Sequence, residues 1–248
     1  MIDPYEEIFE KRGHLYHKGM TLYPQARREE FSNIIKLAQI RHGDIICDIP
    51  SGGGYMKNFI NTKVKIVSIE TSRAFANLCK ANGNSDVAHT NLNNLPIKTN
   101  SVDRISILAG LHHVENKLSF YGESYRILKH NGILCIADAW QGGMVSMFLD
   151  VFVNQHNSMG HQGAYLDENT KGDLEKCGFD VSYLSSIKYY WRFDPLDDMV
   201  TYFQILFGID KASYEEVLHG ITKYLGYSLI NKEYCLNWEL TFYRAIKR

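Results

Sequence analysis

Short apolar runs alternate with segments of helical spacing across residues 41–140 of this chain. The runs, each of strand length, lie near residues 45–49, 64–69, 86–89, 102–107 and 132–138. The segments that predict helices lie near residues 55–60, 73–81 and 117–128. Because apolar strands separated by helices are typical of parallel sheets covered on both faces, this pattern predicts a doubly wound α/β fold.

The chain on either side of this core is also patterned. Residues 1–40 form a helical N-terminal segment, in which Pro24 is expected to begin a helix with one apolar face. The elements expected later are an apolar helix within 142–163, a helix near 167–177, a strand near 179–184, helices near 198–207 and 213–225, and a last strand near 238–245. No linker rich in Pro, Gly or Ser interrupts the chain, so we expect one domain whose core is 41–140 and whose second half is 141–248.

Composition and charge narrow the class of protein. The 248-residue chain is 45% hydrophobic and 22% charged, and its net charge of −1 gives no electrostatic footprint for nucleic acid. It has no run of 18 apolar residues and its N-terminus is acidic, so neither a membrane span nor a signal peptide is expected. Its five cysteines are odd in number and widely spaced, which favours reduced thiols in a cytoplasmic protein over disulfides or a zinc site.

The strongest local signal is a glycine turn after the first apolar run. The strand near 45–49 leads into Pro50-Ser51-Gly52-Gly53-Gly54, and the next apolar run ends on Glu70. Glycines let the backbone adopt positive φ angles and approach a ligand closely. An acid at the tip of the second strand of such a unit accepts hydrogen bonds from ribose hydroxyls, so a cofactor built on a nucleoside is expected.

The spacing of the glycines excludes two common nucleotide sites. A dinucleotide fingerprint counted from Gly52 lacks its third glycine, because Lys57 stands there, and no Gly-Lys-Ser/Thr of a P-loop follows the turn. An acid at the strand end followed by alternate small residues does fit: Asp48, Pro50, Gly52 and Gly54. This pattern resembles motif I of the class I S-adenosylmethionine-dependent methyltransferases, Asp/Glu-x-Gly-x-Gly-x-Gly, with proline in place of the first glycine.

Three further segments carry the same resemblance in the family's order. Residues 90–96 (Thr-Asn-Leu-Asn-Asn-Leu-Pro) are similar to the fourth-strand segment Gly-Asp-Ala-x-x-Leu-Pro. Residues 101–113 resemble Phe-Asp-x-Val…Leu-His-His, and residues 126–138 resemble Arg-x-Leu-Lys-Pro-Gly-Gly-x-Leu-x-Ile-x-Asp. The set looks like that of small-molecule methyltransferases of the ubiquinone/menaquinone type. It implies a seven-stranded, mostly parallel sheet with an antiparallel last strand, and an insertion at about 195–227 that caps the substrate site.

The resemblance also implies the residues that bind S-adenosylmethionine and its product S-adenosylhomocysteine. They are Asp48, Pro50, Gly52, Gly54, Glu70, Thr71, Asn91, Leu92, Ala109 and Gly110. For the cofactor's carboxylate, Arg28 and Tyr16 are the expected partners, with neighbouring Arg27 and Tyr23 as alternatives. Each has a structural alternative: Asp48 and Glu70 would cap helices, and the arginines would lie on a solvated helix face.

Histidines are the expected general bases, because their ordinary pKa lies near neutral pH. His112 and His113 follow the fourth strand, and His156 and His161 flank a polar turn after the apolar helix. A metal site is not expected, because the spacing of His156 and His161 does not place them on one helix face. Aromatic residues of the second half are expected to line an apolar acceptor pocket or to lie in the core: Tyr165, Tyr189, Tyr190, Trp191, Tyr202, Phe203 and Trp238.

The sequence therefore predicts a cytoplasmic methyltransferase, monomeric or homodimeric, that acts on a small apolar or aromatic molecule. Whether O, N or C is methylated stays open. Two alternatives also stay open. One is an NAD(P)-dependent oxidoreductase on the same kind of sheet, and the other is a noncatalytic homologue that binds cofactor or substrate without turnover.

Overall fold

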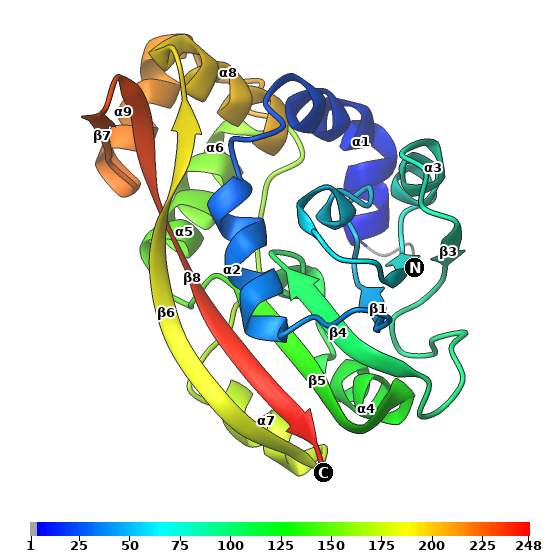
Figure 1. Ribbon diagram of the computed structural model, residues 1–248. Coiled ribbons are helices and arrows are strands. Elements are labelled where there is room, and N and C mark those ends of the chain that lie inside the picture. The colour runs from blue at the N-terminus through cyan, green and yellow to red at the C-terminus, as the bar shows by residue number, and fades with distance from the viewer. Residues whose placement is uncertain (1–3) are drawn as a thin grey trace.

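One mixed sheet organises the molecule, and its strands fan across Figure 1. The computed structural model describes residues 4–248; Met1, Ile2 and Asp3 of the expected N-terminal segment lie outside the described residues. Along the sheet the strands are β3 (Asp86–His89), β2 (Lys65–Glu70), β1 (Ile45–Asp48), β4 (Val102–Leu108), β5 (Leu128–Asp138), β8 (Glu233–Lys247) and β6 (Phe179–Phe193). An eighth strand, β7 (Tyr227–Ile230), pairs only with β8.

The pairing directions confirm the expected class of fold. The pairs among β3, β2, β1, β4 and β5 are all parallel, whereas β8 runs antiparallel to both β5 and β6. Successive strands are added in one direction from β1 to β3 and in the other direction from β4 to β5, so the order switches between β1 and β4. Parallel strands bring their carboxyl ends to a common edge. The ends of β1, β2, β4 and β5 therefore meet where a ligand of this sheet class binds.

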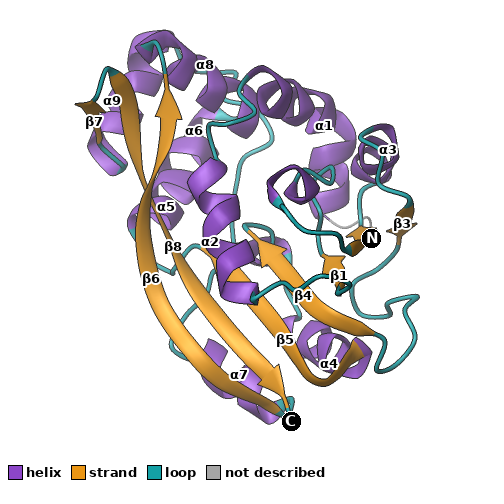
Figure 2. Ribbon diagram, viewed as in Figure 1, coloured by secondary structure: helices purple, strands orange, loops and turns teal. Residues whose placement is uncertain are grey.

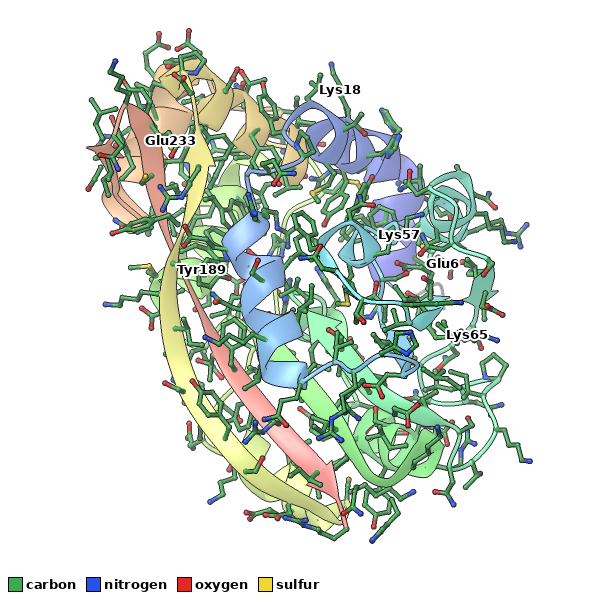
Figure 3. The ribbon with its side chains drawn as sticks, viewed as in Figure 1. Glu6, Lys18, Lys57, Lys65, Tyr189 and Glu233 are labelled. Atoms are coloured by element: carbon green, nitrogen blue, oxygen red, sulfur yellow. The ribbon has the colours of Figure 1, made fainter. Side chains whose placement is uncertain are left out.

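The last part of the sheet is longer than the sequence predicted. The strand expected near 179–184 continues to Phe193, and the strand expected near 238–245 begins at Glu233. The two form a long twisted antiparallel ribbon at one side of the sheet (Figure 1). The aromatic stretch Tyr189–Trp191 thus belongs to a strand, and Figure 3 labels Tyr189 on the part of β6 beside α2.

Helices cover both faces of the sheet (Figure 2). They are α1 (Pro4–Leu22), α2 (Arg28–Ala38), α3 (Arg73–Ala81), α4 (Lys117–Ile127) and α7 (Thr170–Lys176), with short 3-10 turns η1 (Met56–Phe59) and η2 (Leu111–His113). The alternation along β5 explains the two layers: Cys135 and Ala137 pack in one apolar cluster with Ile34 of α2, and Leu134 and Ile136 pack in a second cluster on the opposite face.

The second half of the chain supplies a helical cap. It comprises α5 (Met144–Met147), the π-helix η3 (Phe148–Val153), α6 (Asn154–His156), α8 (Leu196–Phe207) and α9 (Tyr214–Tyr224). Helices α8 and α9 form the insertion expected at about 195–227, and α8 packs against α1. Ser213 and Glu216 form a capping box that begins α9. Within the described residues no helix combines the length and the apolar character needed to cross a membrane.

Candidate active site

The glycine turn after β1 has the backbone that the sequence predicted. Gly52, Gly53 and Gly54 have φ angles of 55°, 95° and 77°. A Cβ added to Gly52 would lie 3.6 Å from the hydroxyl of Tyr16, on the side where α1 covers the turn. Because L side chains rarely adopt such φ angles, the turn presents bare backbone toward α1.

Two buried carboxylates support this turn from behind. The Glu70 carboxylate accepts hydrogen bonds from the Gly52 amide and, at 3.2 Å, from the Ser51 hydroxyl. Asp48 is 3% exposed, and burial together with the charge of Glu70 raises its pKa well above the usual range. Among the described residues, neither carboxylate lines the two cavities at this edge of the sheet, so in this structure both act through the shape of the turn.

A cavity of about 670 Å³ opens at the carboxyl ends of β1, β2 and β4, and we call it the wide cavity. Its lining includes five residues that the sequence assigned to the cofactor: Pro50, Thr71, Asn91, Leu92 and Gly110. Four separate loops, after β1, β2, β3 and β4, contribute these residues, which are brought together only by the parallel sheet. Such a volume lies within the range of small-molecule sites in proteins.

The N-terminal helices place a buried polar network beside the turn. Arg27 donates to the Tyr16 hydroxyl at 2.7 Å and to the Glu30 carboxylate, and Glu30 also accepts from the Trp191 indole at 2.7 Å. Arg27 is 6% exposed and Glu30 is fully buried. The expectation for Arg28 is wrong, because its side chain is exposed and lines neither cavity at this edge; the arginine that faces the site is Arg27.

Three of the four expected histidines come together above the ends of β4 and β5. The ring centroids of His112 and His113 lie 4.1 Å apart, and that of His161 lies 5.6 Å and 5.5 Å from them. The expectation that His156 shares this site is wrong. Its ring packs 4.6 Å from that of Phe152 and lines a separate cavity with α9, because one helical turn after η3 carries it away from His161.

Two carboxylates that the sequence analysis did not assign hold these rings. Asp138, the last residue of β5, lies 2.7 Å from His112 Nδ1, and Asp150 lies 3.0 Å from His161 Nδ1. Asp150 also accepts from the Tyr165 hydroxyl at 2.6 Å. It stands in the π-helix η3, a type of irregularity that is frequent at functional sites. The acid at the end of β5 was visible in the sequence, but no local pattern marks Asp150.

Burial controls the protonation of the cluster. Desolvation, followed by the neighbouring rings and Arg12, lowers the pKa of His113 well below its usual range. Desolvation likewise lowers the pKa of His161, although the bond to Asp150 opposes it. Burial alone would raise the pKa of Asp138, but His112 and backbone amides outweigh it and lower that pKa. Burial therefore favours the neutral imidazole form of His113 and His161.

A second and much smaller cavity, the aromatic cavity, lies on the other side of the cluster and has a volume of about 100 Å³. Its lining includes Arg12, Tyr16, Arg27, Ala109, Val145, Leu149, Trp191, Phe207 and Trp238. It shares only Ile8 and the three histidines with the wide cavity among the described residues. The histidines therefore stand at the junction of the two cavities, and Ala109, in the left-handed region at φ 49°, faces the same junction.

Two buried donors of the aromatic cavity lack hydrogen-bond partners within residues 4–248. They are Arg12 Nε and the Trp238 indole Nε1. The sequence analysis did not single out Arg12, although Ile8, Arg12 and Tyr16 follow one another at intervals of four and share a helix face. Of the expected aromatic set, Trp191 and Trp238 line this cavity, with their rings stacked 4.1 Å apart.

Residues 47–136 match the family model that describes a methyltransferase domain. The matched segment runs from β1 into β5 and contains the glycine turn, Glu70, the Asn91–Leu92 segment and the His112–His113 pair. The chain therefore contains a class I S-adenosylmethionine-dependent methyltransferase domain. The cofactor of this family is S-adenosylmethionine, and its product is S-adenosylhomocysteine.

Solved structures agree with this methyltransferase fold. The YcgJ protein of Bacillus subtilis has a TM-score of 0.63 at 14% identity, covering 89% of this chain and 98% of that one. A methyltransferase from Thermotoga maritima has a TM-score of 0.64 at 15% identity, covering 98% and 99%. Geranyl diphosphate C-methyltransferase from Streptomyces coelicolor, crystallised with Mg²⁺, geranyl diphosphate and S-adenosylhomocysteine, has a TM-score of 0.61 at 10% identity, covering 94% and 84%. At these identities the likeness concerns the fold.

A search of curated proteins found no sequence that matches this methyltransferase. The residues at the cavities therefore carry the argument about its acceptor. They fit the cofactor in two respects: the turn of three positive φ angles is a cradle that any Cβ would strain, and Leu92, which is 8% exposed, offers an apolar surface in the wide cavity beside the polar Asn91.

Proposed function

We propose that this methyltransferase transfers the methyl group to a small, mostly apolar molecule held in the aromatic cavity, and that transfer takes place at the histidine junction. The observation that carries this proposal is the arrangement of two cavities, a wide one lined by the expected cofactor residues and an aromatic one, that share only Ile8 and the three histidines among the described residues. Catalysis by such a protein consists chiefly of positioning, which an enclosed junction supplies.

The proposal gives each cofactor residue a task. Leu92 and Asn91 would hold the base, Thr71 would face the ribose, and the backbone of the turn, which Glu70 supports, and of Ala109 would receive the amino-acid end. When bound, S-adenosylmethionine supplies an activated methyl group on a sulfonium. Arg27 is held by Tyr16 and Glu30. It therefore contributes a fixed positive charge beside the turn.

The aromatic cavity indicates the chemistry of the acceptor. Val145, Leu149 and the stacked Trp191 and Trp238 favour an apolar or aromatic body. Arg12 Nε and Trp238 Nε1 are donors without partners in the described chain, and buried donors are costly when left unpaired. We therefore propose that the acceptor carries an oxygen, such as that of a carboxylate or carbonyl, that takes these hydrogen bonds.

Arg12 provides the test of this assignment. A screen of small aromatic and aliphatic acids with labelled S-adenosylmethionine should identify an acceptor, and Arg12→Leu should then raise its KM about 10–100-fold, because a charge-assisted bond contributes roughly 1.5–3 kcal/mol. The affinity for S-adenosylhomocysteine should not change. Lys11→Leu, an exposed neighbour on α1, is the control. Equal KM values in the two variants would remove Arg12 from the acceptor site.

Glu70 provides a second test, on the cofactor side. Glu70→Ala should weaken S-adenosylhomocysteine binding roughly 10–100-fold, because it removes the charged acceptor that holds the Gly52 amide and so fixes the shape of the turn. Glu70→Gln retains an oxygen for the Gly52 amide and should lose less affinity. Calorimetry that finds native affinity in both variants would exclude Glu70 from the cofactor site.

The hypothesis that a histidine removes the acceptor's proton stays a prediction, now confined to His112, His113 and His161. His112 and His161 each have a carboxylate that would orient the ring. The same three side chains also allow a different use, which the next subsection develops.

A further inference from the structure

The three histidines at the junction form a compact set of nitrogen ligands. One ring nitrogen from each of His112, His113 and His161 lies within 4.8 Å of the others. The sequence analysis excluded a metal because it paired His161 with His156. The fold instead brings His161 from the loop after α6 onto the His112–His113 pair after β4.

The carboxylates around the cluster orient the rings as metal-bound imidazoles are oriented. Asp138 engages Nδ1 of His112 at 2.7 Å, and Asp150 engages Nδ1 of His161 at 3.0 Å. In both rings the nitrogen that remains to bind a metal ion is therefore Nε2. A ligating histidine almost always donates its other N–H to a carboxylate, a carbonyl or water, and such partners fix the tautomer and raise the basicity of the ligand.

We propose that His112, His113 and His161 bind a zinc-type divalent cation, with a fourth coordination position open toward the two cavities. Three protein ligands and one open position are the pattern of catalytic rather than structural zinc sites. Imidazole ligands without thiolates suit Zn²⁺ and its first-row neighbours and not Mg²⁺ or Ca²⁺, which prefer oxygen. The lining residues put the open position at the junction, since these three histidines border both cavities.

To bind a zinc ion, the three ring nitrogens would have to move only slightly closer together. Zinc–nitrogen bonds of about 2.0–2.1 Å place tetrahedral ligands about 3.3 Å apart, so the present limit of 4.8 Å would shrink by about 1.5 Å. Charge also permits a cation. Asp138 and Asp150 contact the rings. Two arginines line the aromatic cavity, but Arg27 is paired with Glu30, so the two carboxylates at the rings outnumber the remaining arginine, Arg12.

This metal site goes beyond the proposed function and would add a way to activate the acceptor. A metal at the junction would accept the oxygen or nitrogen of an acceptor as its fourth ligand and make its proton easier to remove. The part of the proposal that concerns the acceptor rests on the proposed function, whereas binding of the metal does not. The test therefore measures metal binding without cofactor or acceptor.

The experiment uses the full chain without an affinity tag, stripped of metal by a chelator and titrated by calorimetry with zinc chloride alone. We expect one ion per chain with a dissociation constant of about 1 µM or tighter. His113→Ala and His161→Ala should each weaken binding about 100-fold or more. Asp150→Asn, which removes no proposed ligand but disturbs the orientation of His161, should weaken it about 10–100-fold.

His156→Ala is the matched control, because this histidine lies in a separate cavity and should leave zinc affinity unchanged. The five free cysteines are common to all variants, so zinc held by a thiol would persist in His161→Ala. Should an alanine variant fail to fold, His161→Gln and Asp150→Asn carry the same comparison. The proposal is overturned by the lack of saturable one-to-one binding, or by equal affinities in the His161 and His156 variants.

Discussion

Replacing Glu30 by leucine should destabilise the fold by about 3–5 kcal/mol, which is the cost of breaking a buried ion pair from one side. Glu30 is fully buried and accepts hydrogen bonds from Arg27 and from the Trp191 indole. Without Glu30, the Arg27 guanidinium stays buried between the rings of Phe31 and Trp191. Its remaining short hydrogen bond among the described residues is to the Tyr16 hydroxyl. Chemical denaturation followed by circular dichroism measures the change.

The neighbouring residue supplies the control. Glu29 pairs with Arg192 at 2.8 Å, but both side chains are 36% exposed. Glu29→Leu should therefore cost no more than about 1 kcal/mol. The double substitution Arg27→Met with Glu30→Leu should recover much of the loss, since it removes both buried charges. If Glu30→Leu and Glu29→Leu lose similar amounts of stability, the buried network contributes no more to stability than the exposed ion pair does.

Gly52→Val should abolish cofactor binding while the protein remains folded. The φ angle of 55° is strained for a branched residue, and the new side chain would project toward Tyr16, where the amino-acid end of the cofactor is proposed to lie. We expect no detectable heat with S-adenosylhomocysteine and a folded far-ultraviolet spectrum.

Gly43→Val separates strain from occlusion. Gly43 has a φ angle of 85° in an exposed turn, and a Cβ there would meet nothing within 4 Å. This variant should lose stability comparably but retain the native affinity for S-adenosylhomocysteine. If Gly52→Val also binds normally, the glycine turn is not the cofactor cradle.

The core of the fold was predictable because local patterns determine it. Each parallel strand is a short apolar run followed by a turn, and β1, β2, β4 and the end of β5 lie where the pattern placed them. The strand β6 was predicted too short, because residues 180–188 are only partly buried or exposed and the stability of this part comes from pairing with β8. The short strand β7 depends on the same partner.

The residues of the candidate site also fall into those that local patterns predict and those that only tertiary packing positions. Residues within the motifs, such as Asn91, Leu92 and Gly110, lie in one cavity because parallel strands bring their ends together. Arg12 and Asp150 were missed, and His156 was misplaced, because helices outside the motif region position them. The packing of α1 and the π-helix η3 against the sheet edge is a tertiary result that spacing in the sequence does not reveal.

A crystal structure of the protein with S-adenosylhomocysteine tests the central claim most directly. The account predicts the adenine against Asn91 and Leu92 in the wide cavity and the sulfur at the opening that His112, His113 and His161 border. The decisive measurement is the distance from the cofactor sulfur to the nearest histidine ring. We expect the gap between them to be no wider than one acceptor group. A cofactor whose sulfur lies away from the histidine junction would contradict the account.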